Sequence, residues 1–240
     1  MSKSSFALQV IHEDNHYIAV NKPSGALVHG DGSDAPVLSD DVKAYIKLRY
    51  NKPGDVFLGV AHRLDRPVSG VVVYARTSKG LERLNELLKE RAVKKTYWAL
   101  TDRLPPEQED TLTHWMIKDT TINKSRVYDS KPKKHGDMAK EAVLRYSMLS
   151  HFAGLYMLQI ELETGRSHQI RAQLAHIGCP IVGDVKYGSQ RLVSDQSIAL
   201  HCREMSFMHP IKKELVVITA NPPKTNEWEL SQWKHVKMEE

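Results

Sequence analysis

The sequence predicts an α+β fold built on a mixed, mainly antiparallel sheet with few flanking helices. Three observations support this. Short β-rich segments separated by polar turns recur along the chain, only a few segments have helical spacing, and there is no internal repeat or low-complexity linker. Hydrophobic residues make up 41% and charged residues 26% of the 240 residues, which is typical of a globular protein. We expect a single domain over 1–240, with its core at about 10–222.

The strands are predicted from runs of β-branched and aromatic residues bounded by turn residues. The first is a pair of strands around a polar turn within 10–20. The others are 56–61, 70–75, 95–101, 112–118, 141–149, 155–163, 198–208 and 214–219.

Three helices are predicted from apolar residues spaced three or four apart. The first covers about 38–50, with an inner face of Val42, Tyr45, Ile46 and Leu48. The second runs from a cap at Thr77 or Ser78 to about Glu90, and its apolar side is formed by Leu81, Leu84, Leu87 and Leu88. The third follows Ser167, the expected N-cap, and runs through Ile170, Leu174 and Ile177. A short helix is also expected after Asn226.

Net charge and cysteine content indicate the class of partner and the compartment. The net charge is +5 and the isoelectric point is near 9.0, which suits an anionic partner such as nucleic acid. Two cysteines are too few for a disulfide framework and fit a reducing compartment. The first ten residues lack the apolar stretch of a signal peptide, and no run approaches the ~18 apolar residues of a membrane span. We therefore expect a soluble, cytoplasmic protein.

Segment 123–140 is strongly basic, with six Lys or Arg residues against two Asp. It is polar and loop-like, and it is a candidate arm for contacting phosphates. The residues expected to do so are Lys124, Arg126, Lys131, Lys133 and Lys134. The alternative is a solvated surface hairpin with no ligand.

A polar motif, His62-Arg63-Leu64-Asp65-Arg66-Pro67-Val68-Ser69-Gly70, stands between two apolar strands. Unpaired burial of these side chains would cost several kcal/mol, so they must emerge at a sheet edge or in a cleft. Two arginines flank Asp65 and favour its ionised form, which suits a nucleophile or a charge stabiliser. The alternative is a structural salt bridge at the end of a strand.

A second polar run, 163–173, contains Arg166, His168 and Arg171. The N-terminus of the predicted helix could hold an anion. A capped helix followed by a tight loop would give the same spacing. Segment 178–188 then supplies two glycine turns around the aliphatic pair Ile181-Val182.

These motifs together resemble RluA-type pseudouridine synthases. The His62-Arg63-Leu64-Asp65 motif with Ser69-Gly70 is similar to the signature of that family. Its companions occur in the family's order: Asn21-Lys22-Pro23-Ser24-Gly25 with Val28-His29, Lys95-Thr96-Tyr97-Trp98-Ala99, Thr164 to Arg171, Gly178 to Gly188, and Leu200-His201 before His209-Pro210. The resemblance covers residues ~10 to ~222, and six collinear blocks make chance an implausible explanation.

The resemblance implies roles for particular residues. Asp65 would be the essential carboxylate, Tyr97 the aromatic residue that packs on the target base, and Arg171 the cation that pairs with the catalytic acid. Arg63 would fill the space left by a flipped nucleotide, and Leu200 would lie near the base pocket. Further RNA contacts are expected from His62, Arg66, Arg166 and His168.

The chain departs from the family pattern at two positions. Val68 replaces the usual threonine before Ser-Gly, and Gln173 replaces the common histidine two residues after Arg171. Both departures concern loop packing or substrate contact rather than the reaction. The N-terminal S4-type RNA-binding domain that is frequent in the family is not expected here.

The reaction that the resemblance implies is cofactor-independent isomerisation of specific uridines in structured RNA, either 23S-type ribosomal RNA or transfer RNA. The base must leave its stack, which costs a few kcal/mol. The carboxylate of Asp65 then adds to C1′, adds to C6 of the uracil, or removes the C2′ proton, and the sequence leaves all three routes open. We expect a monomer that needs no metal.

Three other functions are possible alternatives for this sequence. A glycoside hydrolase needs two carboxylates, so Glu161, Glu163 or Asp184 would have to approach Asp65. A catalytically silent RNA-binding protein of the same fold would have less reason to keep Asp65, Tyr97 and Arg171. A zinc enzyme built from the twelve histidines is disfavoured, because no His-x₃-His motif is accompanied by suitable third ligands.

Overall fold

The computed structural model describes all residues except 1–6, 31, 33–34, 194–196, 230–232 and 234–240. The start of the chain, where no signal peptide is expected, is therefore only partly described. Contacts divide the chain into two compact units. Unit 1 comprises Met1–Lys95 and Cys202–Pro223, and unit 2 comprises Thr96–His201 and Lys224–Glu240. None of the helices in the described part of the chain is long and apolar enough to cross a membrane.

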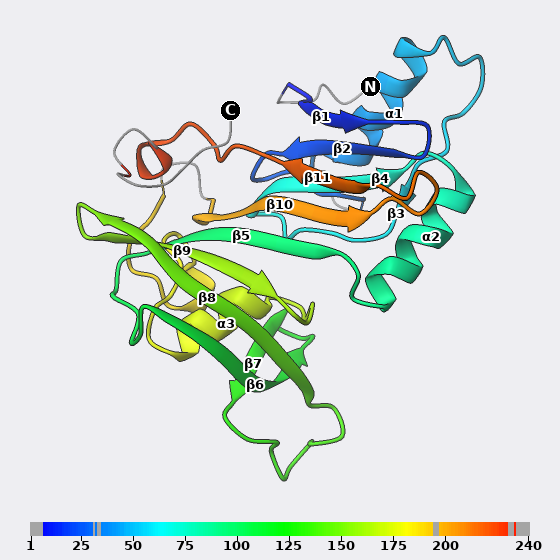
Figure 1. Ribbon diagram of the computed structural model, residues 1–240. Helices are drawn as coiled ribbons and strands as arrows, with labels where there is room; N and C mark the ends of the chain where they lie inside the picture. Colours follow the sequence, from blue (N-terminus) through cyan, green and yellow to red (C-terminus); the bar gives the residue numbers. More distant parts are fainter. Residues whose placement is uncertain (1–6, 31, 33–34, 194–196, 230–232, 234–240) are drawn as a thin grey trace. The chain divides into compact units, whose positions relative to one another are not determined.

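Unit 1 contains a sheet with the strand order β1-β2-β4-β10, in which β3 pairs with β4 and β11 with β10 (Figure 1). The strands are β1 (Val10–Glu13), β2 (Tyr17–Lys22), β3 (Gly59–Val60), β4 (Ser69–Ala75), β10 (Leu200–Met208) and β11 (Leu215–Thr219). All seven residues of β4 are buried, so both of its faces are covered.

Two helices belong to unit 1. They are α1 (Leu38–Arg49) and α2 (Ser78–Lys89), and α2 packs against β3 and β4. The Oγ1 atom of Thr77 accepts a hydrogen bond from the backbone N–H of Gly80 at 3.0 Å, which confirms the predicted cap. Gly70 has a φ of +116°, and a Cβ at this position would collide with the backbone of Cys202. The glycine of the polar motif therefore lets β4 approach β10 closely.

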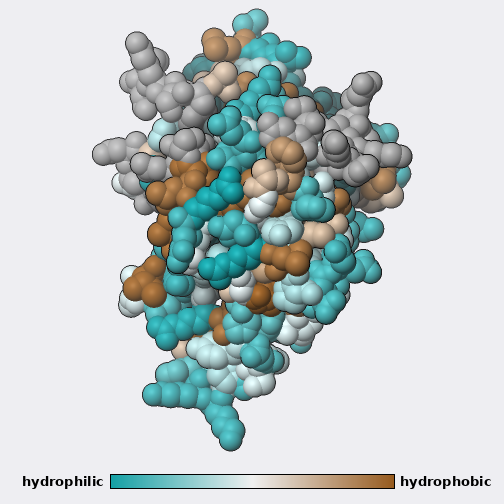
Figure 2. Space-filling view, turned by 90° about the vertical axis from the view of Figure 1, so that its left-hand side faces the viewer, coloured by the Kyte–Doolittle hydropathy of each residue, from teal (hydrophilic) through white to brown (hydrophobic). Residues whose placement is uncertain are grey.

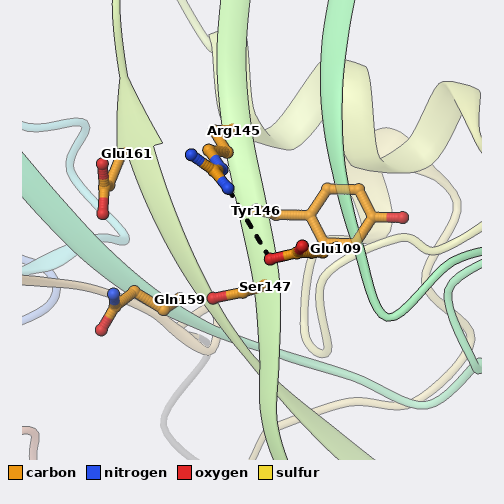
Figure 3. Close-up of a pocket in the computed structure, with 6 residues that line it drawn as sticks. All are labelled: Glu109, Arg145, Tyr146, Ser147, Gln159 and Glu161. Carbon is orange, nitrogen blue, oxygen red and sulfur yellow. Dashed lines mark ion pairs between the residues drawn. The ribbon is translucent and has the colours of Figure 1, made fainter.

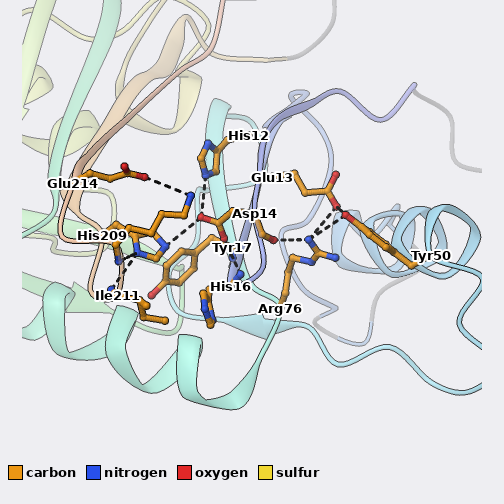
Figure 4. Close-up of polar contacts among 11 residues, drawn as sticks. His12, Glu13, Asp14, His16, Tyr17, Tyr50, Arg76, His209, Ile211 and Glu214 are labelled. Atoms are coloured by element: carbon orange, nitrogen blue, oxygen red, sulfur yellow. Dashed lines mark hydrogen bonds and ion pairs between the residues drawn. The ribbon is translucent and has the colours of Figure 1, made fainter.

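A buried polar cluster joins two turns of unit 1 (Figure 4). The carboxylate of Asp14 accepts hydrogen bonds from the backbone N–H groups of His16 and Tyr17 and closes the β1–β2 turn. Its other oxygen lies 3.2 Å from Nε2 of His209. Nδ1 of His209 accepts from the N–H groups of Ile211 and Lys212, so the ring proton is on Nε2 and faces Asp14. The cluster explains the His209-Pro210 motif as a structural feature.

Unit 2 contains the strand order β5-β9-β8-β6-β7. The strands are β5 (Lys94–Thr101), β6 (Glu109–Asp119), β7 (Lys124–Tyr128), β8 (Lys140–Phe152) and β9 (Leu155–Leu162). Helix α3 (Gln169–His176) packs through Ala172 on Ala142 of the sheet, and the short helices η1 (Val185–Tyr187) and η2 (Asn226–Trp228) follow. The registers described within either unit pair strands antiparallel, in line with a sheet predicted to be mainly antiparallel.

Most predicted elements are confirmed, and four details were wrong. Leu48 is 79% exposed, because it lies about 200° around α1 from Ile46. Segment 56–61 forms only the two-residue β3, because only Gly59 and Val60 pair with β4, at Ala75 and Tyr74. Residues 124–128 form β7 instead of a loop. Finally, α3 begins after His168, whose φ is 55°, and Ser167 is not its cap. The single-domain expectation stays a prediction.

Candidate active site

Asp65 lies in unit 1 on the loop between β3 and β4. Its carbonyl oxygen accepts a hydrogen bond from the N–H of Val68 at 3.1 Å, which closes a turn directly after the carboxylate. Arg63 and Arg66 on either side are exposed, and Asp65 is half-buried. Two hydrogen bonds between Gly25 and Arg66 tie the loop to the chain that follows β2. The charged side chains of the motif therefore lie on a turn whose backbone is held by hydrogen bonds.

Lys22 holds this loop by hydrogen bonds to its backbone, and it was not among the predicted site residues. Its side chain is fully buried, and Nζ donates to the carbonyl oxygens of Pro23 at 3.0 Å, Arg66 at 3.1 Å and Val68 at 2.6 Å. Burial lowers the pKa of Lys22 to about 7, while the charge of Asp65 acts in the opposite direction. The signal was a lysine at the end of an apolar strand, directly before a proline.

His62 has a structural role that its place in the motif did not reveal. Its Nε2 atom accepts a hydrogen bond from the backbone N–H of Val73 at 3.0 Å. Burial, and next the charge of Lys95, lower the pKa of His62 to about 3, so the ring is neutral. RNA contact by His62 stays a prediction, and the exposed Arg63 and Arg66 are better placed to reach a ligand.

In unit 2, Arg171 of α3 forms a buried two-point ion pair with Asp184. Its Nε lies 2.7 Å from Oδ2, and its Nη2 lies 2.9 Å from Oδ1. The guanidinium carbon lies 5.2 Å from the centre of the Tyr187 ring. This paired geometry fixes the plane of the guanidinium group. From sequence, Asp184 was a candidate only for the second carboxylate of a hydrolase, and its pairing with Arg171 was not predicted.

The residues before α3 are held by the side chain of Gln169. Its Oε1 accepts from the N–H of Arg166 at 2.9 Å and from the hydroxyl of Thr164 at 2.8 Å, and its Nε2 donates to the carbonyl of Val143. This amide fixes the turn that leads into α3, whereas no side chain caps the helix itself. Nδ1 of His168 lies 2.9 Å from the hydroxyl of Tyr187.

Tyr97 lies on the face of the unit 2 sheet that carries α3. Tyr97 on β5 is paired with Ile160 on β9, which is paired with Tyr146 on β8, so the three side chains lie on one face of the sheet. Ala142 lies four residues before Tyr146 on β8 and therefore points to the same face, against which α3 packs. Leu200, at the start of β10, is buried. Tyr97, Arg171 and Leu200 thus belong to unit 2, whereas Asp65 belongs to unit 1.

The basic residues lie on β7 and in the segment after it. Nζ of Lys124 is 5.1 Å from the centre of the Tyr187 ring, and Nζ of Lys131 is 5.2 Å from that of Trp115. Arg126 pairs with Asp119 at 3.3 Å. Lys133 and Lys134 are exposed. Five of the eighteen residues of the basic segment therefore lie in β7, and Lys133 and Lys134 face solvent.

The two departures from the family pattern are both buried. Val68 is 3% exposed and closes the turn after Asp65. Gln173 is fully buried, and its Nε2 lies within 3.2 Å of the carbonyl oxygens of Leu112 and Ala142. Gln173 therefore anchors α3 to the sheet.

Unit 2 also has a polar pocket of about 280 Å³, which none of the predicted site residues lines (Figure 3). Glu161 lines it, and because Glu161 neighbours Ile160 on β9, its side chain points to the face opposite Tyr97. The other lining residues are Glu109, Arg145, Tyr146, Ser147 and Gln159. This geometry removes Glu161 as a catalytic partner for the face that carries Tyr97.

Comparison with known proteins identifies relatives over most of the chain. The family model described as RNA pseudouridylate synthase matches residues 16–176. Ribosomal large subunit pseudouridine synthase C of Buchnera aphidicola is 31% identical over 223 residues, covering 90% of this chain and 67% of the relative. Ribosomal large subunit pseudouridine synthase D of Xanthomonas campestris is 33% identical over 230 residues, covering 90% and 66%. The chain thus spans about two thirds of the length of these relatives.

Two solved human structures share the fold. RNA pseudouridylate synthase domain containing 4 matches with a TM-score of 0.77 and 24% identity, covering 93% of this chain and 92% of that chain. RNA pseudouridylate synthase domain containing 1 matches with a TM-score of 0.70 and 22% identity, covering 97% and 90%. These likenesses confirm the predicted fold.

The buried amine of Lys22 predicts a pH dependence of stability. Unfolded lysine keeps its proton to a pH of about 10.5, whereas folded Lys22 loses it near pH 7. Between these values the unfolded chain binds more protons, so the free energy of unfolding rises with pH, by up to ~1.4 kcal/mol per pH unit. Urea denaturation from pH 6 to 10 should show this slope in the wild type relative to Lys22→Met.

The control is Lys43→Met, which removes an exposed lysine of α1. Its stability should run parallel to that of the wild type over the same pH range. If Lys22→Met also runs parallel, folded Lys22 keeps its proton and this description of the buried amine is wrong.

Proposed function

Because the chain belongs to the RNA pseudouridylate synthase family, we propose that it isomerises uridine to pseudouridine in structured RNA. The observation that carries the proposal is that Asp65, within the family's motif, lies on a turn whose backbone is held by hydrogen bonds, two of them from the buried Lys22. The alternative of a catalytically silent RNA-binding protein is not favoured, since Asp65, Tyr97 and Arg171 are all retained. The relatives are named as enzymes that act on the ribosomal large subunit.

The reaction needs an ionised carboxylate in a pocket that excludes water. The proposal assigns this role to Asp65, with Arg171 as the cation that stabilises it. Asp184 holds the guanidinium plane through two hydrogen bonds and so acts as a positioning residue. Lys22 fixes the backbone of the turn that carries the carboxylate. The chemistry is an internal transfer of the ribosyl bond from N1 to C5, so electrons balance without a cofactor.

The target base must leave its stack before it reacts. Arg63 is exposed next to Asp65 and would enter the vacated space, where its planar group can stack and donate hydrogen bonds. Tyr97 offers an aromatic ring to the base on the α3 face of unit 2. Leu200 would contribute an apolar wall to the same pocket.

The proposed substrate is ribosomal RNA of the large subunit, with transfer RNA as the comparison pool. The basic segment 123–140 would grip the phosphate backbone. Figure 2 shows a hydrophilic surface at the lower end, the level at which the loop between β7 and β8 lies in Figure 1. We expect the enzyme to act as a cytoplasmic monomer, without metal in the chemistry.

Tritium release tests the activity and the substrate together. Joining C5 to the ribose displaces the hydrogen on C5, so RNA labelled with tritium at C5 of uridine should release it. The wild type should release tritium from large-subunit ribosomal RNA, and Asp65→Asn should lower the rate at least ~10³-fold while RNA binding persists. No release from ribosomal or transfer RNA, with binding intact, would contradict the proposal.

The Asp184 pair predicts a selective loss of turnover. Asp184→Asn keeps the shape of the side chain but removes the charge that orients Arg171, and a misplaced cation costs roughly 10–100-fold in rate. Single-turnover measurements should show this loss with RNA affinity within about threefold of the wild type. Asp55→Asn, which changes an exposed carboxylate outside the basic segment, is the matched control. Unchanged turnover in Asp184→Asn would remove the positioning role.

The phosphate-gripping role of the basic arm predicts a change in salt dependence. Lys133→Gln/Lys134→Gln removes two exposed charges, so the plot of log affinity against log salt should become shallower by about 1–2. Affinity should fall similarly for unrelated RNA sequences, because phosphate contacts carry no sequence information. A slope equal to that of the wild type would show that the arm does not contact RNA.

A further inference from the structure

Three potential metal ligands from distant parts of the sequence meet in unit 2. His114 lies on β6, His176 is the last residue of α3, and Asp129 directly follows β7. Their donor atoms all lie within 4.8 Å of one another. Oδ1 of Asp129 is 2.7 Å from Nε2 of His176 and 3.7 Å from Nε2 of His114. No local motif links these positions, so the sequence could not reveal the group.

The ligand types and their exposure suit a metal ion of one class. Two imidazoles and one carboxylate form a set that binds Zn²⁺, with a fourth position open to water. The side chain of Asp129 is 84% exposed, that of His176 31% and that of His114 9%, so one side of the group is open to solvent.

We propose that His114, Asp129 and His176 form a binding site for a divalent transition-metal ion of the zinc class. The observed donor separations bracket the ~3.4 Å expected between ligands of a tetrahedral ion with bonds of about 2.0–2.1 Å. Small side-chain movements would bring all three donors onto one ion. The site is independent of Asp65 and does not rest on the proposed reaction.

Gln173 controls which ring nitrogen of His114 is available. Its Nε2 lies 2.9 Å from Nδ1 of His114 and also contacts the carbonyl oxygens of Leu112 and Ala142, so three acceptors share two protons. Its Oε1 is buried without a hydrogen-bond partner among the described residues. A metal on Nε2 of His114 leaves the ring proton on Nδ1, which needs an acceptor.

Turning the Gln173 amide over supplies that acceptor. Oε1 would then face Nδ1–H of His114 and gain the partner that it lacks, but it would also lie beside the carbonyl oxygens of Leu112 and Ala142, and Nε2 would leave both of these acceptors. The turn therefore costs free energy that the bound ion has to offset. Metal binding is thus coupled to the orientation of a residue that departs from the family pattern.

The position of the site indicates a structural role for the ion. Asp129 is the first residue after β7 and begins the segment that carries Lys131, Lys133 and Lys134. His176 ends α3, the helix that carries Arg171. A bound ion would therefore connect the residue that follows β7 to α3 and to β6, and it would stabilise the folded state.

The test is a calorimetric titration of Zn²⁺ into the full chain after removal of metal with a chelator, accompanied by thermal unfolding. Asp129→Ala and His176→Ala remove partly or largely exposed ligands and should leave the fold intact. His151→Ala removes an exposed histidine of β8 outside the site and is the control.

The wild type and His151→Ala should bind one equivalent of Zn²⁺ and unfold at a higher temperature when it is present. Both site variants should bind at least ~10-fold more weakly and lose the shift in unfolding temperature. Absence of one-to-one binding in the wild type would overturn the proposal, as would equal binding by the site variants. Neither result depends on catalysis, so failure here is distinct from failure of the proposed reaction.

Discussion

The buried amine of Lys22 is the interaction on which the catalytic loop depends. A lysine is seldom buried completely, because its charged form loses hydration. Here its amine donates hydrogen bonds to the carbonyl oxygens of Pro23, Arg66 and Val68. The segment after β2 and the turn after Asp65 are therefore held by the same amine. The loop therefore gains a fixed backbone geometry from a residue more than forty positions away in the sequence. A rigid turn is what a carboxylate needs if it is to meet a reacting carbon with little reorganisation.

Unit 2 holds its own charged group by a similar principle. The guanidinium of Arg171 is planar, and Asp184 takes two of its donors, so its orientation is set before any substrate arrives. Gln169 and Tyr187 then hold the residues around the start of α3 through short hydrogen bonds. Each unit thus prepares one part of the proposed chemistry with buried, paired polar groups. Such groups are costly when a partner is lost, which is why Asp184 and Lys22 matter although neither carries the reaction.

The fold was largely predictable from sequence because periodicity reports burial directly. The leucines of α2 and the alternation of β5 and β9 identified those elements, and Thr77 capped α2 as expected. Asp65 and Arg171 could be chosen because their motifs resemble those of a known family. The supporting contacts could not be predicted, since Lys22 bonds to backbone atoms and Asp184 pairs with a residue thirteen positions away. The error at Ser167 has the same origin: α3 begins after His168 without a side-chain cap, and the turn before it is held by the amide of Gln169, which reaches back to Arg166 and Thr164.

The most direct test of the account is the fate of the base, because isomerisation and hydrolysis begin with the same broken bond. Large-subunit ribosomal RNA treated with the enzyme should be digested to nucleosides and analysed by chromatography with mass detection. The small molecules released from the RNA before digestion should be analysed in the same way. Isomerisation predicts a new nucleoside of the same mass as uridine but a different retention time, with no free uracil. Free uracil and an abasic ribose would instead identify a hydrolase and contradict the role proposed for Asp65.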